Sequence, residues 1–99
     1  MNIEYIAHKG KKYTIEWYYN NRGASDALEY FNDLPIARKK KLLSLFITMG
    51  EMGKIFKKDK FINEDDQIYA FKPSPDRFLC FFFKGSKNHL YQRVRKKDR

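Results

Sequence analysis

The chain has 99 residues, which is the size of one small domain and too short for two hydrophobic cores. Its 21 Lys and Arg residues outnumber 12 Asp and Glu, so the net charge is +9. This charge favours a polyanionic partner, and nucleic acid is favoured over an anionic membrane. Nine Phe, seven Tyr and one Trp provide enough apolar surface for a core and argue against a disordered chain.

The first part of the chain contains two short runs in which apolar and polar residues alternate. Tyr13, Ile15 and Trp17 alternate with polar residues at a period of two, which predicts a half-buried strand over 12–19. A weaker alternation over 2–7 allows two alternatives for the residues before this strand. They form an extra strand paired through a turn at Gly10, or they are a loose segment over 1–11.

Two helices are expected next. Ser25 or Asp26 caps the first helix, which stops before Pro35 because proline is unsuited to a helix interior and suited to a helix start. The second helix covers about 35–52, and Gly53 ends it. Its apolar side chains recur at spacings of three and four and predict one buried stripe, widened by two neighbours. The stripe is Leu42, Leu45, Phe46, Met49 and Met52, and the neighbours are Leu43 and Ile47.

The remaining part of the chain is rich in strand-forming residues. Residues 54–66 are highly charged and predict a loop, and three β-rich runs follow over 67–71, 77–83 and 88–94. The middle run is apolar on both faces and predicts the central strand. The order β-α-α-β-β-β predicts a single α+β domain over 1–99, with two helices packed on one face of a mostly antiparallel sheet.

Positive charge is concentrated in the strand-rich half. Residues 1–53 have a net charge of +2, whereas residues 54–99 have a net charge of +7, with the highest density in the tail at 95–99. Lysines and arginines at the edge of a concave sheet are suited to binding phosphates.

The single cysteine, Cys80, lies between apolar residues and excludes an intramolecular disulfide or a multi-cysteine zinc site. It is typical of a reducing compartment. Three consecutive acids at 64–66, with no second cluster, do not predict a metal site. The first residues lack the features of a signal peptide, and no stretch approaches the roughly 20 apolar residues of a spanning helix. We therefore expect a soluble, cytoplasmic protein.

Four stretches of the chain, taken together in chain order, resemble a known family. They are GASDALEYFNDLP at 23–35, MGEMGK at 49–54, IYAFKPSPDRFLCFFFKGSK at 68–87 and RKK at 95–97. Together they resemble the RelE/ParE superfamily of toxins from bacterial toxin–antitoxin pairs, in its HigB-like, phage-derived branch. The resemblance covers about residues 12–97.

The resemblance implies an mRNA interferase, which enters the ribosomal A site and cuts the message without a metal or other cofactor. A ribose 2′-OH attacks the adjacent phosphate and leaves a cyclic phosphate and a 5′-OH. The protein must orient or deprotonate the 2′-OH, offset the negative charge of the phosphorane and help the 5′ oxygen leave. The implied partners are the ribosome with its mRNA and an acidic or helix-turn-helix antitoxin.

The resemblance also implies site residues. Arg77 matches the arginine that opens the central strand, and it is the best candidate for binding the scissile phosphate because a planar guanidinium grips two oxygens at once. Lys60 and Lys72 match basic residues before and at the end of the preceding strand, and Tyr91 is a further catalytic candidate. The expected RNA-binding residues are Lys84, Arg93, Arg95, Lys96 and Lys97.

The chain departs from the family in its last strand. Relatives often carry a His-Gly-Phe-like triplet where this chain has Gln92, Arg93 and Val94, so the expected histidine is absent. The nearest groups are His89 and Tyr91, and Tyr91 could stack on a base or serve as an acid. Two alternatives therefore stay open, a ParE-like toxin that inhibits DNA gyrase and an inactive member that only binds its antitoxin. The nuclease hypothesis requires a guanidinium that is not locked to a carboxylate in a neutral groove.

Overall fold

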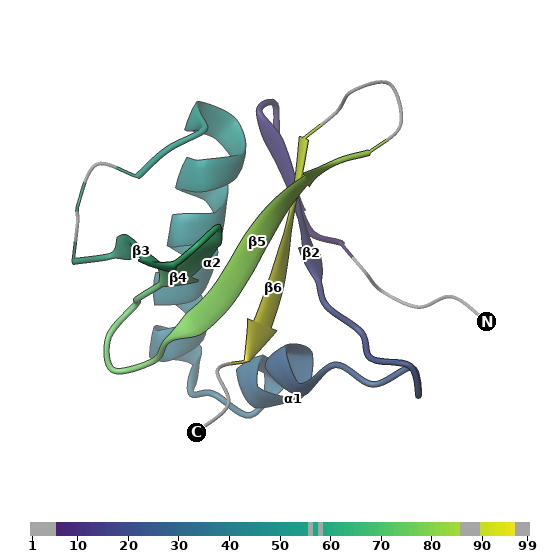
Figure 1. The fold of residues 1–99 in the computed structure, drawn as a ribbon. Helices are drawn as coiled ribbons and strands as arrows, with labels where there is room; N and C mark the ends of the chain where they lie inside the picture. The colour runs from purple at the N-terminus through teal and green to yellow at the C-terminus, as the bar shows by residue number, and fades with distance from the viewer. Residues whose placement is uncertain (1–5, 56, 58, 86–89, 97–99) are drawn as a thin grey trace.

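The computed structural model describes all residues except 1–5, 56, 58, 86–89 and 97–99, and describes Leu90 and Lys96 by their backbone. The elements are β1 (Ile6–Lys9), β2 (Tyr13–Trp17), α1 (Asp26–Asn32), α2 (Ile36–Met52), β3 (Phe61–Asp65), β4 (Ile68–Phe71), β5 (Phe78–Lys84) and β6 (Leu90–Lys96) (Figure 1).

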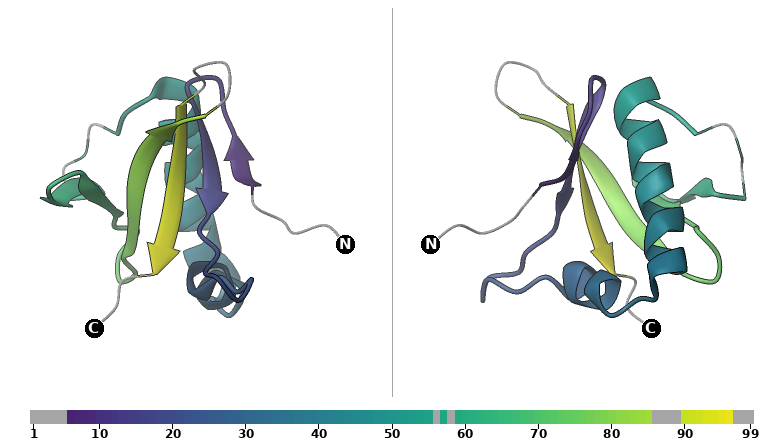
Figure 2. Two further views of the ribbon diagram at one scale, coloured as in Figure 1. Left: turned by 45° about the vertical axis from the view of Figure 1, so that its right-hand side comes forward. Right: turned by 180° about the vertical axis from the view of Figure 1, so that it is seen from behind.

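The strands form one sheet in the order β1-β2-β6-β5-β4-β3. All neighbouring strands are antiparallel except β2 and β6, which are parallel. The two views of Figure 2 show α2 along one face of the sheet, with α1 near the end of β6. The α+β class with a mostly antiparallel sheet is therefore confirmed. The apolar run that we expected to be internal is β5, which lies between β6 and β4.

The core lies between the sheet and the helices. Side chains on alternate positions of the strands face α2, and most of them are completely buried. The largest core side chains are Ile15, Trp17, Phe71, Phe78, Val94, Leu42, Phe46 and Met49. The Trp17 ring contacts Phe31 of α1 and Phe46 of α2 at centroid distances of 5.3 and 5.6 Å, so this one side chain joins both helices to the sheet.

The helix ends follow the local sequence. Ser25, rather than Asp26, is the N-cap of α1, and its hydroxyl accepts a hydrogen bond from the Leu28 amide at 3.3 Å. Helix α2 begins directly after Pro35 and ends at Gly53, whose φ of 81° lies in the left-handed region that glycine readily adopts. Neither helix, within the residues that the structure describes, is long and apolar enough to cross a bilayer.

The structure differs from the expected elements at both ends of the sheet. Of the two alternatives for the first residues, the described part has the hairpin, and its strand β1 covers Ile6–Lys9 and so extends past the alternation expected over 2–7. Residues 2–5 of that alternation lie outside the described residues. The prediction of a loop over 54–66 was wrong in part, because this segment contains β3. This strand pairs with β4 from Phe61 opposite Phe71 onward, so its neighbour holds it in place despite its charged sequence.

The apolar stripe expected on α2 is narrower in the structure. Leu42, Phe46 and Met49 are at most 1% exposed, as expected. Met52 is 59% exposed, because it lies in the last turn of the helix, and Ile47 is 50% exposed. Leu43 and Ile47 each follow a core residue by one position, and one position turns a side chain by about 100° around the helix. The stripe therefore stabilises the core through fewer positions and leaves apolar side chains on the outer surface.

Candidate nucleic-acid interface

A pocket of about 410 Å³ lies where β4 connects to β5. Its lining comes from the turn before β3 and from the connection between the two strands. The lining residues are Asp59, Lys60, Lys72, Ser74, Pro75, Asp76 and Arg77. This cavity, which we call the Arg77 pocket, brings together three of the four predicted catalytic residues, Lys60, Lys72 and Arg77.

Backbone hydrogen bonds hold the two sides of the Arg77 pocket together. The Lys72 amide donates to the Lys60 carbonyl at 2.7 Å, and the Lys60 amide donates to the Lys57 carbonyl at 3.0 Å. The first bond extends the pairing of β3 and β4 by one residue, and the second closes the turn before β3. Both lysines therefore start from neighbouring positions of the backbone.

Asp76 anchors the connection that carries Arg77. Its side chain is buried and accepts hydrogen bonds from the Tyr30 hydroxyl of α1 and from Arg38 of α2, whose Nε lies 2.9 Å from Oδ2. The hydrogen bond to Asp76 raises the pKa of Tyr30, and the same carboxylate raises the pKa of Arg38. The sequence did not predict this cluster, because Arg38 and Asp76 are far apart along the chain.

The Arg77 guanidinium forms an ion pair with Glu64. Its Nη1 lies 2.7 Å from Glu64 Oε2, and both side chains are partly exposed. The free guanidinium expected from the sequence is therefore absent. The pocket nevertheless keeps a positive charge. Asp76 is paired with Arg38 and Arg77 with Glu64, so Lys60 and Lys72 face only one further carboxylate of the lining, Asp59. A guanidinium has five N–H donors, so a phosphate can bind Arg77 beside Glu64 or displace it.

Tyr91 lies at the other end of the sheet from the Arg77 pocket. Phe78 is opposite Lys96 and Phe83 is opposite Tyr91, so the two levels are separated by five residues, about 17 Å at about 3.3 Å per residue. The Tyr91 ring stacks on Phe83 at a centroid distance of 5.2 Å and packs on Gly85, where an added Cβ would lie 2.2 Å from the ring. The structure therefore does not bring Tyr91 to the other catalytic candidates.

The sheet face opposite the helices combines aromatic rings with arginines. We call it the aromatic–arginine face, and its residues are Tyr18, Phe81, Phe83, Tyr91, Arg93 and Arg95. The Arg93 guanidinium lies 4.4 Å from the Phe83 centroid and that of Arg95 lies 5.6 Å from Tyr18. Arg93 also donates to Glu16 at 3.1 Å. Rings that are only half-buried, next to cations, are typical of surfaces that bind single-stranded nucleic acid.

The other RNA-binding candidates, Lys84, Lys96 and Lys97, are not among the residues that define the aromatic–arginine face. Lys84 is exposed at the end of β5. Lys97 and the side chain of Lys96 lie outside the described part of the chain. Gln92, at the position where relatives often carry histidine, is completely buried. A histidine in this register would face the core, so the missing proton-transfer group cannot be supplied from that position.

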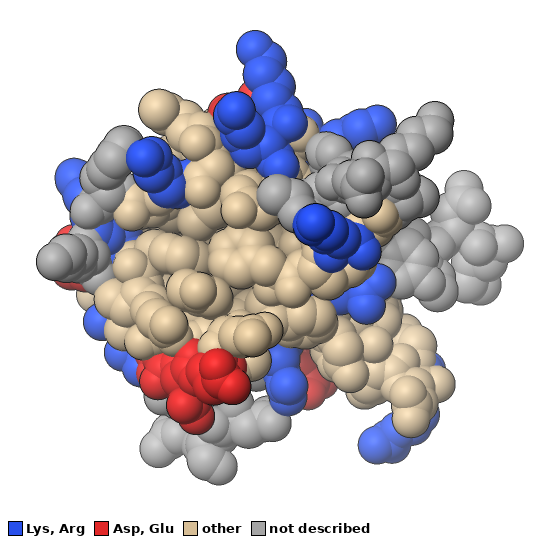
Figure 3. Space-filling view, turned by 45° about the horizontal axis from the view of Figure 1, so that its top comes forward, with Lys and Arg blue, Asp and Glu red and all other residues tan. Residues whose placement is uncertain are grey.

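Charged side chains are unevenly distributed on the face of the molecule that Figure 3 shows. Figure 3 shows Lys and Arg side chains around a largely uncharged area, with most of the visible acidic atoms in one group. Cys80 takes no part in either surface, because it is buried in the core and burial raises the pKa of its thiol.

Comparisons with protein-family models, with curated proteins and with solved structures give no match to this chain. The resemblance to RelE/ParE toxins therefore stays a prediction.

Proposed function

We propose that the chain is the toxin of a toxin–antitoxin pair and acts as a ribosome-dependent, metal-independent mRNA endonuclease. The observation that carries the proposal is the meeting of Lys60, Lys72 and Arg77 in one pocket. Arg77 directly precedes β5, and strand alternation places it on the same side as Phe81 and Phe83. An RNA strand that stacks on the aromatic–arginine face can therefore extend to the pocket.

The pocket contains the groups that the reaction needs. Cations at Lys60, Lys72 and Arg77 offset the charge that develops on the phosphorane. Asp59 is a carboxylate of the pocket that can accept the proton of the 2′-OH. The new bond joins the 2′ oxygen to phosphorus, the bond from phosphorus to the 5′ oxygen breaks, and a lysine ammonium protonates the leaving oxygen. Tyr91, about 17 Å away along the sheet, stacks on a base and does not transfer a proton.

Cleavage of mRNA in a translating bacterial lysate tests the proposal. Mapping of the 5′ ends of the message should reveal new ends with the wild-type chain. Arg77→Ala should reduce cleavage by about 100-fold, the typical loss when one transition-state donor is removed. Arg22→Ala removes an exposed arginine in the turn after β2 and is the matched control, with unchanged cleavage. Intact messages during active translation would contradict the proposal.

Two observations favour a second candidate function. The ion pair between Arg77 and Glu64, together with the distant position of Tyr91, suits a ParE-like toxin that binds DNA gyrase and has no nuclease chemistry. Purified gyrase separates the two functions. Inhibition of supercoiling, with mRNA left intact in the lysate, would select the binding toxin.

The outer surface of α2 suits the antitoxin that the proposal requires. Ile36, Leu43 and Ile47 are exposed apolar residues in one row of the helix, and Lys40 lies in the same row. An acidic, amphipathic segment would cover the apolar side chains and neutralise the lysine. The product of the neighbouring gene should raise the melting temperature of the chain. Absence of both binding and stabilisation would contradict this part of the proposal.

A further inference from the structure

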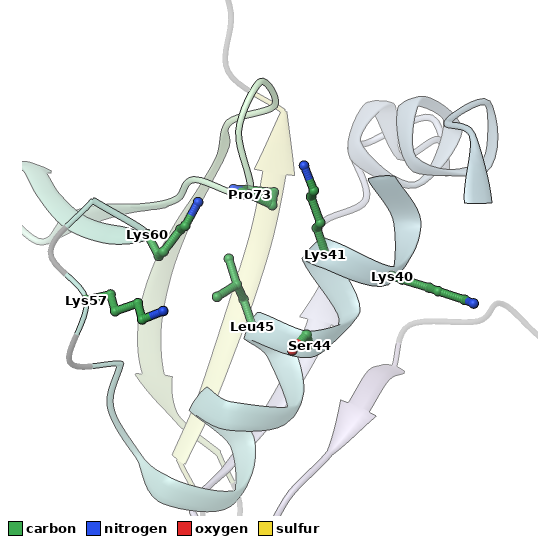
Figure 4. A pocket seen from close by; sticks show the side chains of 7 residues that line it. All are labelled: Lys40, Lys41, Ser44, Leu45, Lys57, Lys60 and Pro73. Carbon is green, nitrogen blue, oxygen red and sulfur yellow. The ribbon is translucent and has the colours of Figure 1, made fainter. Parts of the chain in front are cut away.

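A second cavity, of about 430 Å³, lies between α2 and the chain segments around β3 and β4. We call it the lysine pocket. Helix α2 and two separate segments supply its lining, as Figure 4 shows. The lining residues are Lys40, Lys41, Ser44, Leu45, Lys57, Lys60 and Pro73.

Three lysines surround the cavity. In Figure 4, Lys57 extends from the segment before β3 toward α2 and Lys60 extends from the same segment toward Pro73. Lys41 rises from α2 beside Pro73, whereas Lys40 points away. The Lys41 ammonium donates only a long hydrogen bond, 3.4 Å, to the Ser74 carbonyl. None of the seven lining residues is acidic, and no described carboxylate forms an ion pair with these lysines.

The interior of the lysine pocket is apolar. Leu45 is half-buried at its centre and Pro73 is buried at its border. A cation-lined rim with an apolar floor selects a ligand that has several negative charges at one end and an apolar group at the other. The volume lies in the range of sites for small organic ligands, about 300–1,000 Å³.

We propose that the lysine pocket binds a nucleoside diphosphate or triphosphate. The phosphates lie between Lys41 on one side and Lys57 and Lys60 on the other. The base and ribose rest against Leu45 and Pro73. An ammonium is a point charge on a flexible stem, so three of them can follow a phosphate chain without a fixed fork geometry.

The lysine pocket shares Lys60 with the Arg77 pocket. A nucleotide that holds this side chain withdraws it from RNA, so the nucleotide should inhibit cleavage competitively. This coupling rests on the proposed endonuclease, whereas nucleotide binding itself does not.

Titration of the full chain with a fluorescent ATP analogue tests the inference. Lys41→Gln and Lys57→Gln should each weaken binding at least tenfold, because each removes one phosphate contact from outside the Arg77 pocket. Lys9→Gln removes an exposed lysine of β1 and is the matched control, with less than a twofold change. Equal losses in all three variants would mean nonspecific charge attraction and would overturn the inference.

Two further ligands identify the source of the phosphates. ATP should bind more tightly than inorganic triphosphate, because only ATP contacts the apolar floor; equal affinities would overturn the assignment to a nucleotide. A short single-stranded RNA should lose less affinity than ATP in Lys57→Gln, and an equal or larger loss would assign the pocket to the RNA strand instead. These binding measurements do not depend on cleavage. A chain that binds ATP as expected but leaves mRNA intact would refute the proposed function alone.

Discussion

Among single residues, Glu64 affects how strongly Arg77 can bind a phosphate. Its carboxylate occupies one side of the guanidinium, and an ion pair of this exposure is worth about 0.2–1 kcal/mol. Glu64→Gln keeps the shape of the side chain and removes its charge. We expect the affinity for a short single-stranded RNA, measured by fluorescence anisotropy, to rise about two- to fivefold, because the phosphate no longer competes with a carboxylate.

Asp66→Asn is the matched control for Glu64→Gln. It removes the same charge from an exposed position two residues away, and the ion pair described for Arg77 is with Glu64 and not with Asp66. A similar gain in both variants would mean that only the net charge matters. A loss of affinity in Glu64→Gln would show that the carboxylate positions the guanidinium instead of competing for it.

Gln92 has a polar group in the core that the surroundings do not satisfy. Its Nε2 donates to Cys80 Sγ at 2.9 Å, but its buried Oε1 has no hydrogen-bond partner among the described residues. A buried polar atom without a partner costs about 1–3 kcal/mol. Gln92→Met, which is similar in length, should therefore increase the free energy of unfolding by about 1 kcal/mol in urea denaturation. Decreased stability in this variant would contradict the account of the amide.

The sequence predicted the basic residues of the site but not the side chains that they pair with. Lys60, Lys72 and Arg77 flank strands that are consecutive in the chain, so a sequence reading can place them near one another. The partners that control them, Glu64 and Asp76, depend on the register shift of β3 between Asn63 and Asp65 and on burial. No local pattern encodes either property. Tyr91 was grouped with the catalytic lysines although the strand register places it at the opposite end of the sheet.

Among the elements, the β1–β2 turn lies in close contact with the end of α2. The Lys12 amide donates to the Gly50 carbonyl at 2.7 Å, and His8 of β1 pairs with Glu51 at 2.9 Å. A Cβ on Gly10 would lie 2.3 Å from the backbone of Gly50. Two glycines in contact therefore let the hairpin approach the helix.

Gly10→Ala should separate the hairpin from α2. Because the added methyl group meets backbone and not a movable side chain, we expect a loss of about 1–3 kcal/mol in the free energy of unfolding. Urea denaturation measures this loss. Lys11→Ala changes the next, exposed residue and should stay within about 0.5 kcal/mol of the wild type. Equal stabilities of the two variants would contradict the close contact.

The elements themselves were largely predictable, because most of them are encoded by local periodicity. The strand over 12–19, both helices and the three later strands occur within about three residues of their expected ends. Strand β3 was missed because only Phe61 and Ile62 in it are strongly apolar, and its pairing with β4 supplies what its own pattern lacks. The parallel pairing of β2 with β6 joins distant parts of the chain, and no local signal specifies it.

Across the whole molecule, four acidic residues lie beside basic groups other than the lysines of the two pockets. Glu16, Glu51, Glu64 and Asp76 are each held by a basic group, and the net charge of the chain is +9. No described carboxylate forms an ion pair with the lysines that line the Arg77 pocket and the lysine pocket. Their repulsion opposes the compact state, and an anion or salt should reduce it.

The melting temperature should therefore rise with ionic strength. At 0.1 M salt the screening length is about 10 Å, which is comparable to the size of the lysine-lined cavities, whereas the partly buried ion pairs are screened less. Between about 0.02 and 0.3 M NaCl we expect an increase of several degrees, measured by differential scanning fluorimetry. Lys57→Gln should reduce this increase, because it removes one of the charges that repel, and Lys9→Gln should not. A melting temperature that falls with added salt would mean that the internal ion pairs, and not the repulsion between unpaired lysines, dominate the electrostatics of the fold.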